Sequence, residues 1–184
     1  MDRFQLLVFG ILSLIIIYSS RKLLLKPKSH GFYRFLSWEC IAFMFAINYP
    51  VWFKDVFAWN QIISWIFLIY CVIPLFGGVI LMKKKGKSEE SRRDDTLFKF
   101  EKTSQLIQTG IFKYIRHPLY SSLLFLTWGI YFKDPINLIL VFSIVSSIFL
   151  YLTAKTEEKE NIKYFKDEYR EYMRHSKMFI PFIL

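Results

Sequence analysis

Five long apolar stretches recur along the 184-residue chain and constrain its fold more than any other feature. A helix needs about 20 apolar residues to cross about 30 Å of hydrocarbon. Four of the stretches reach or approach that length, and the fourth in order reaches it only if residues 114–118 enter the interface. The sequence therefore predicts an all-α, polytopic membrane protein with about five transmembrane helices, rather than a soluble domain. The predicted spans are residues 4–25, 33–53, 59–82, 119–132 and 136–154.

The basic residues alternate between the connections of these stretches. Lys and Arg number five in residues 21–34, ten in residues 83–118 and seven after residue 154, whereas only three lie elsewhere. Basic residues concentrate in the cytoplasmic loops of membrane proteins. We therefore attribute the net charge of +10 to membrane topology and not to nucleic-acid binding. The expected orientation has the N-terminus outside and the C-terminus in the cytoplasm of a bacterium or archaeon.

The chain is predicted to form a single membrane domain in three parts. Residues 1–82 hold three spans, residues 83–104 form a charged cytoplasmic linker, and residues 105–184 hold two spans and a C-terminal helix. After residue 155, apolar side chains recur at helical spacing, which predicts a cytoplasmic amphipathic helix that ends near Pro181. Pro74, Gly77 and Gly78 are expected to interrupt the third span. The apolar stripe of the tail consists of Ile162, Phe165, Tyr169 and Tyr172.

Two residue types inside the spans bear on chemistry. Glu39 is the one carboxylate within a predicted span. It is either a functional group or a residue that reaches toward Arg34 at the cytoplasmic interface. Cys40 and Cys71 have no spacing typical of a metal site, so we expect buried apolar side chains and no metal centre.

The segment before the fourth span carries the first cluster of polar residues. Arg116 and His117 precede Pro118, and proline favours the first turn of a helix. The helix dipole disfavours a cation at this end, whereas an anion such as a carboxylate or phosphate is favoured there. Arg116 is therefore either an anion-binding residue or one more topogenic basic residue.

The second cluster is Glu157 and Glu158, one turn beyond the fifth span. Four residues further on, the two acids meet Asn161 and Ile162, so neither has a basic partner at that spacing. Lys155 is the one base within reach of Glu158. The pair is either a solvated helix face or a site for a cationic group.

Together these clusters resemble the isoprenylcysteine carboxyl methyltransferase and phospholipid methyltransferase families. The resemblance extends from Gln105 to Pro181, and it departs from the family pattern at Phe112, Ser122 and Lys166. The matching positions are Leu106, Ile107, Gly110, Arg116, His117, Pro118, Tyr120, Glu157, Glu158, Phe165, Tyr169, Tyr172 and Pro181.

The resemblance implies a methyltransferase that uses S-adenosylmethionine at the cytoplasmic membrane face. Its acceptor would be lipophilic, such as a prenylcysteine-like carboxylate or another lipid-like substrate. The alternatives are methyl transfer to a phospholipid amine, and a membrane assembly or transport protein without catalysis. The expected partners are the lipid bilayer and a lipophilic substrate, with neither nucleic acid nor metal.

The same resemblance assigns site residues. Arg116 would orient the acceptor or the cofactor carboxylate, and Glu158 would share the catalytic role. A carboxylate acceptor needs no general base, because it is already ionised at neutral pH, whereas an amine would pass a proton to a glutamate. The residues implied to bind the cofactor are Leu106, Ile107, Gly110, His117, Pro118, Tyr120, Glu157 and Glu158.

Overall fold

The computed structural model describes residues 1–86 and 104–183. These residues form six α-helices and two short 3₁₀ helices, η1 and η2. The element bounds are α1 Arg3–Leu24, α2 His30–Asn48, η1 Tyr49–Val51, α3 Trp59–Lys85, η2 Gly110–Lys113, α4 Pro118–Tyr131, α5 Asn137–Phe165 and α6 Asp167–His175. Residues 87–103, most of the predicted linker, lie outside the described part of the chain.

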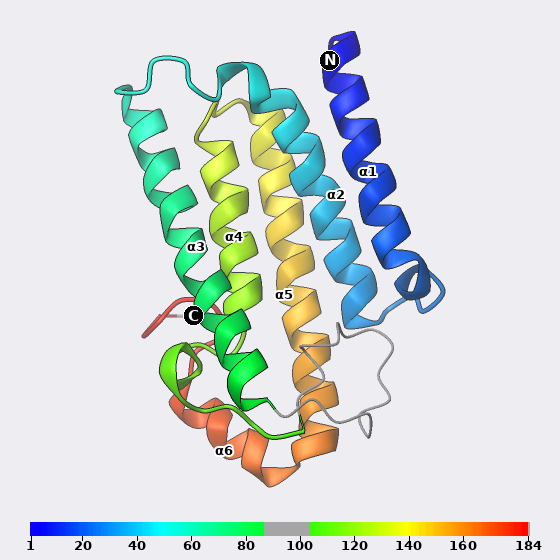
Figure 1. Ribbon diagram of the computed structural model, residues 1–184, viewed down its shortest axis with the longest axis vertical. Helices are drawn as coiled ribbons and strands as arrows, with labels where there is room; N and C mark the ends of the chain where they lie inside the picture. The colour runs from blue at the N-terminus through cyan, green and yellow to red at the C-terminus, as the bar shows by residue number, and fades with distance from the viewer. Residues whose placement is uncertain (87–103, 184) are drawn as a thin grey trace.

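Helices α1 to α5 stand side by side and alternate in direction, and α6 lies across one end of the bundle (Figure 1). Helix α1 packs on α2, α2 packs on α5, and α3 packs on α4. The α1–α2 connection, the end of α3, the start of α4 and the end of α5 all lie at the end that carries α6. The described parts of the segments rich in Lys and Arg therefore meet at one end of the molecule, which is the end that the charge pattern predicts to be cytoplasmic.

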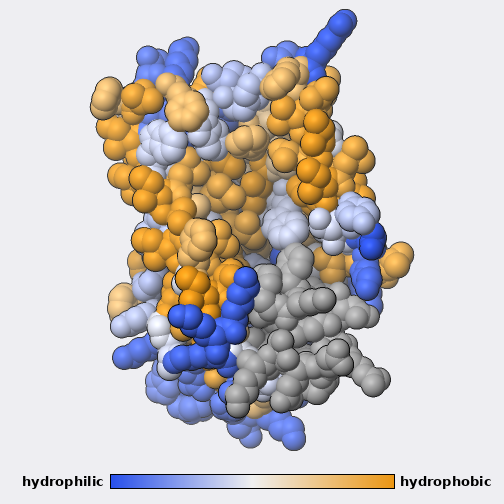
Figure 2. Space-filling view, in the orientation of Figure 1, coloured by the Kyte–Doolittle hydropathy of each residue, from blue (hydrophilic) through white to orange (hydrophobic). Residues whose placement is uncertain are grey.

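Three of the described helices are long and apolar enough to cross a membrane: α1, α3 and α5. Helix α2 has 19 residues and includes His30, Arg34 and Glu39, and α4 has 14 residues, or about 21 Å. The all-helical fold is thus confirmed, whereas five crossings stay a prediction. Figure 2 shows hydrophobic side chains over the middle part of one face and hydrophilic ones at both ends, most of them at the lower end.

Small polar residues hold the centre of the bundle together. The hydroxyl of Ser146 on α5 lies 2.8 Å from that of Ser37 on α2 and 3.2 Å from that of Thr127 on α4. Ser64 on α3 donates a hydrogen bond of 2.7 Å to the carbonyl of Gly129 on α4. Small residues let helix backbones approach closely, and their hydroxyls bond across the interface. Small polar residues within a mostly apolar sequence thus determine which helices pack against each other.

The third span is not interrupted as expected. Helix α3 runs unbroken through Pro74, which is buried within it. Neighbouring helices and local adjustments can compensate for proline in membrane helices. The glycines serve close packing instead: a Cβ at Gly78 would lie 3.0 Å from Cγ of Pro118, the first residue of α4. Gly78 therefore seats the start of α4 against α3.

The C-terminal helix also differs from the prediction. The fifth span and the tail form one continuous helix of 29 residues, α5, which ends at Phe165. Its apolar part ends at Ala154, and the remaining charged turns extend past it. Lys166 then adopts a positive φ of 55°, and the chain turns into the nine-residue α6, which ends at His175 and not near Pro181. This turn bends the apolar stripe back over the bundle end.

Glu39 has a partner on α1. The Ser13 hydroxyl donates a hydrogen bond of 2.8 Å to Oε2 of Glu39 and so joins α1 to α2. This geometry favours a structural contact over a side chain that reaches toward Arg34. Cys40 is buried and Cys71 is half-buried, and both are free thiols.

Candidate active site

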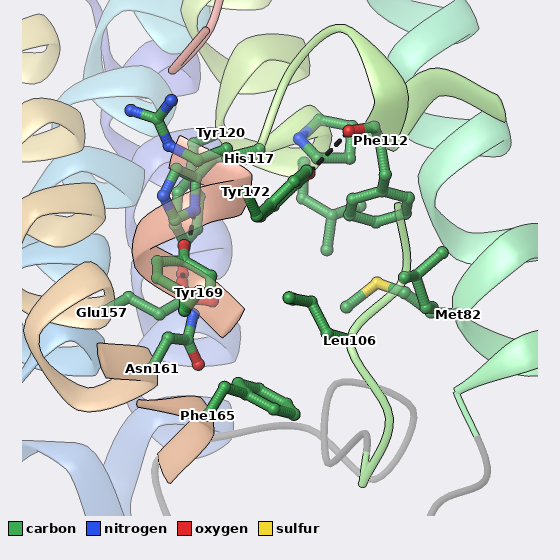
Figure 3. A pocket seen from close by; sticks show the side chains of 14 residues that line it. Met82, Leu106, Phe112, His117, Tyr120, Glu157, Asn161, Phe165, Tyr169 and Tyr172 are labelled. Atoms are coloured by element: carbon green, nitrogen blue, oxygen red, sulfur yellow. Dashed lines mark hydrogen bonds and ion pairs between the residues drawn. The ribbon is translucent and has the colours of Figure 1, made fainter. Parts of the chain in front are cut away.

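A pocket opens at the α6 end of the bundle, between the end of α3, the segment before α4, the charged turns of α5, and α6 (Figure 3). Including its open mouth, the space between these elements measures about 620 Å³. Most of its walls are aromatic or aliphatic, with a few polar groups among them. The lining residues are Met82, Leu106, Ile107, Phe112, Arg116, His117, Pro118, Leu119, Tyr120, Glu157, Asn161, Phe165, Tyr169 and Tyr172.

The segment before α4 is built by a glycine turn and by pairing with the C-terminal segment. Gly110 has a φ of +61°, and a Cβ there would lie 2.5 Å from Cδ1 of Leu81, so the position favours glycine. The backbone N–H of Arg116 donates to the carbonyl of Lys177 at 2.8 Å, and that of His117 donates to the carbonyl of Met178 at 3.2 Å. Two segments 60 residues apart in sequence thus fix the Arg-His-Pro motif in place.

Arg116 and Glu158 form a buried ion pair at the base of the site. Nε and Nη2 of Arg116 lie 2.9 and 2.8 Å from Oε1 of Glu158, and both side chains are less than one-tenth exposed. Nη1 of Arg116 donates to the carbonyls of Met173 and Ser176. The guanidinium therefore ties α5, α6 and the C-terminal segment together. This pairing also explains how a cation is tolerated at a helix start.

The environment of Glu158 stabilises its ionised form. Burial alone would raise the pKa of this carboxyl group, but the neighbouring His117 and Arg116 outweigh burial and lower the pKa from 4.5 to about 2. Lys155 adds a contact of 3.2 Å to Oε2. The sequence had identified Lys155 as the one base within reach, but Arg116, 42 residues away, is the closer partner.

Glu157 points to the other side and lines the pocket. The Tyr120 hydroxyl donates to its Oε2 at 2.5 Å, and Nδ1 of His117 lies 3.8 Å from the same oxygen. Burial would raise the pKa of Glu157, but the charges of His117 and His30 and the hydrogen bond from Tyr120 together lower it. Glu157 thus lines the cavity as a carboxylate.

The helix α6 supplies an aromatic wall. Burial raises the pKa values of the Tyr169 and Tyr172 hydroxyls above their ordinary range, so both stay protonated. The Tyr172 hydroxyl donates to the backbone carbonyl of Phe112 at 2.6 Å, which is the dashed line in Figure 3. Phe165 and Tyr169 stack with ring centroids 6.4 Å apart. These rings close the pocket on the side away from α3.

Most residues assigned from the sequence meet at this one pocket. The lining includes Leu106, Ile107, Arg116, His117, Pro118, Tyr120 and Glu157. Gly110 and Glu158 do not line it: Gly110 shapes the turn beneath Leu81, and Glu158 lies behind the wall against Arg116. Seven further lining residues had no site role predicted from the sequence. Three of them, Phe165, Tyr169 and Tyr172, belong to the family pattern. The seven are Met82, Phe112, Leu119, Asn161, Phe165, Tyr169 and Tyr172.

No cluster of His, Cys, Asp or Glu that could hold a metal ion occurs within residues 1–86 and 104–183.

Residues 88–168 match the family model described as phospholipid methyltransferase. Methanethiol S-methyltransferase 1 of Bradyrhizobium diazoefficiens is 31% identical over 71 residues, which are 39% of this chain and 24% of that protein. The methanethiol S-methyltransferase of Crocosphaera subtropica is 34% identical over 76 residues, 40% of this chain and 28% of that protein. The corresponding protein of Pseudomonas deceptionensis is 30% identical over 73 residues, 39% of this chain and 26% of that protein.

The matched segments thus span about a quarter of the length of these relatives. No solved structure matches the chain. The matched residues include both motif clusters and the helices that carry them. In its C-terminal half the chain is therefore similar to an integral membrane methyltransferase family, which confirms the resemblance drawn from its sequence.

Proposed function

We propose that the protein is a methyltransferase that binds S-adenosylmethionine in this pocket and methylates an acceptor that reaches it from the membrane. The observation that carries the proposal is the convergence of the Arg-His-Pro segment and Glu157 on one partly aromatic cavity. Because the pocket lies at the end rich in Lys and Arg, we place it on the cytoplasmic side, with the N-terminus outside.

The residues present suit this methyl donor. S-adenosylmethionine carries an ammonium group, ribose hydroxyls, an adenine ring and a sulfonium cation. Glu157 offers a carboxylate acceptor for the ammonium or hydroxyl groups, and the rings of Phe165 and Tyr169 suit adenine stacking or contact with the cation. Nε2 of His117 is buried without a hydrogen-bond partner among the described residues, so a ligand would complete the site.

Within this proposal the assigned residues divide into two groups. We expect the first group to contact the cofactor directly, and it consists of Leu106, Ile107, His117, Pro118, Tyr120 and Glu157. Gly110, Arg116 and Glu158 act by positioning. Gly110 sets the turn, and the Arg116–Glu158 pair holds the motif against α5. The predicted catalytic roles of Arg116 and Glu158 thus become indirect, since each engages the other.

Methyl transfer requires a positioned acceptor and the exclusion of water, and a site at the membrane end of a helical bundle supports both. The named relatives are methanethiol S-methyltransferases, which favours a thiol as the acceptor. The family model is described by phospholipid methylation, which keeps a phospholipid amine as the second candidate. Neither name supports the prenylcysteine-like carboxylate that the sequence resemblance suggested.

The test is methyl transfer by the purified protein in lipid nanodiscs, with S-adenosylmethionine labelled in its methyl group. The acceptors are a small alkyl thiol, a phospholipid with a primary amine headgroup and a prenylated cysteine with a free carboxylate. We expect transfer to the thiol and inhibition by S-adenosylhomocysteine. Transfer to none of the three, together with no binding of S-adenosylhomocysteine, would favour a non-catalytic assembly or transport protein.

A further inference from the structure

The His117 side chain has an unusual position in the site. It lines the pocket and is only 3% exposed, yet its Nε2 has no hydrogen-bond partner among the described residues. Buried polar nitrogens are nearly always paired, so an unpaired one on a residue that lines a pocket indicates a group that receives a ligand or a proton. The pocket proposed for S-adenosylmethionine is thus lined by a histidine whose Nε2 lacks a hydrogen-bond partner among the described residues.

The ring is held rigidly. It stacks on Tyr120 with centroids 5.5 Å apart and an interplanar angle of 18°, and its own backbone N–H bonds to the C-terminal segment. Nδ1 lies 3.8 Å from Oε2 of Glu157, and Nε2 lies 3.7 Å from Oε1 of Glu158. Both distances exceed hydrogen-bond length, but both are short enough for strong attraction between opposite charges.

A thiol acceptor makes a base necessary. Alkyl thiols are mostly protonated at neutral pH, and the thiolate is the nucleophile. We propose that His117 is the general base of the reaction, and that the acceptor of this pocket is therefore one that carries a proton, a thiol above all. This proposal rests on the function proposed above.

The acceptor sulfur forms a bond to the methyl carbon while the bond between that carbon and the sulfonium sulfur breaks, and the bonding pair stays on the leaving sulfur. The thiol proton moves to Nε2 of His117. The imidazolium so formed lies between the carboxylates of Glu157 and Glu158, which stabilise its charge, and the proton passes to water when the products leave.

The other candidate bases in the site are less suitable. Oε2 of Glu157 already accepts the Tyr120 hydroxyl, and the pKa of Glu157 is lowered. Glu158 does not line the pocket and is engaged by Arg116 and Lys155. Charged and titratable groups surround the His117 ring from several elements: Arg116 beside it, Tyr120 of α4, Glu157 and Glu158 of α5, and Tyr169 of α6. His30 and Arg34 of α2 act on the charge of Glu157.

The test compares two acceptors in wild-type protein and His117→Asn. One acceptor is an alkyl thiol that is protonated at the assay pH, and the other is an acidic aromatic thiol that is already ionised. With saturating S-adenosylmethionine, we expect His117→Asn to lose about 100-fold in turnover of the alkyl thiol. The loss with the ionised thiol should be no more than a few-fold. His175→Asn is the matched control, since His175 is exposed on α6 and pairs with Glu171.

Equal losses with the two thiols, or no loss with either, would overturn the proposal. Calorimetric binding of S-adenosylhomocysteine to His117→Asn gives a readout besides activity, and because His117 also lies against the proposed cofactor, we expect the affinity to fall by no more than a few-fold. A measurement that needs no variant is the solvent deuterium isotope effect on wild-type turnover. We expect an effect with the alkyl thiol and none with the ionised thiol, and no effect with either thiol contradicts a base. Failure of the proposed function differs from all of these, because wild-type protein then methylates neither thiol.

Discussion

The Arg116–Glu158 ion pair should contribute more to stability than any other polar contact of the site. Glu158→Gln keeps the size of the side chain but removes its charge, and it leaves a guanidinium that is only 8% exposed without a charged partner. Breaking a buried pair by removing one partner costs about 3–5 kcal/mol. The substitution therefore tests whether the pair holds the motif segment to α5.

Two independent routes give a similar magnitude. The environment lowers the pKa of Glu158 from 4.5 to about 2, which corresponds to about 3 kcal/mol of preference for the ionised form in the folded protein. Because the folded-state pKa lies below the unfolded value, this stability is present above about pH 4.5 and is lost as the pH falls toward 2. Lys155 adds little, since its side chain is 41% exposed.

The assay is unfolding in mixed detergent micelles, followed by far-ultraviolet circular dichroism. We expect the free energy of unfolding of Glu158→Gln to fall by about 3 kcal/mol at neutral pH, and the difference from wild type to shrink in acid. Glu171→Gln is the matched control, because that carboxylate is exposed on α6 and pairs with Arg174 and His175 of its own helix. A change below about 1 kcal/mol for Glu158→Gln would refute the reasoning.

Three further outcomes follow from the geometry. Burial lowers the pKa of His30, but its 2.6 Å hydrogen bond to Glu160 and the nearby acidic charges outweigh burial and raise the pKa. The stability that His30 contributes should therefore be complete below pH 6.5 and fade as the pH rises above that value. His30→Gln should remove this pH dependence from the free energy of unfolding. Gly110→Ala should cost about 1–2 kcal/mol, measured by the same unfolding assay, because φ is +61° and the new Cβ meets Leu81. A reporter inserted at Asp55 should face the outside, and one fused to the C-terminus should face the cytoplasm. If both reporters face the same side, the result contradicts an odd number of crossings between Asp55 and the C-terminus.

The helices were predictable because apolar length is a strong signal. The third stretch, 59–82, becomes α3 over Trp59–Lys85, and the fourth, 119–132, becomes α4 over Pro118–Tyr131. The fifth was predicted too short, since charge after Ala154 ends a membrane span without ending the helix itself. Hydropathy reports where the chain meets lipid, whereas helix ends depend on backbone turns such as the one at Lys166.

Contacts between distant segments were not predictable. Lys133 lies in a loop that the sequence placed outside the membrane, yet it is 1% exposed. Its Nζ donates to Gln61 Oε1 at 3.0 Å and to the carbonyl of Trp52 at 3.2 Å, and it lies 3.7 Å from the ring centroid of Trp65. These partners are about 70 to 80 residues away in sequence and have no shared pattern, so only the folded chain brings them together.

In the candidate site, too, some features were predictable from the sequence and others depend on the folded chain. The resemblance selected His117 and Glu157, which the fold brings together at the pocket, but it gave Glu158 an equal place there. On a helix, adjacent residues point about 100° apart, so two neighbouring acids cannot both face one cavity directly. The aromatic wall of Tyr169 and Tyr172 was visible as a helical stripe, and it lines the pocket because the turn at Lys166 folds α6 back.

Binding of S-adenosylhomocysteine, measured by calorimetry on the detergent-solubilised protein, tests the central claim most directly. We predict that wild-type protein binds it, that Glu157→Gln weakens binding about tenfold or more while the protein stays folded, and that Glu171→Gln binds as wild type does. The tenfold figure corresponds to about 1.4 kcal/mol, near the lower end for a hydrogen bond to a charged group. No binding by wild-type protein, or unchanged affinity in Glu157→Gln, would contradict the assignment of this pocket to the methyl donor.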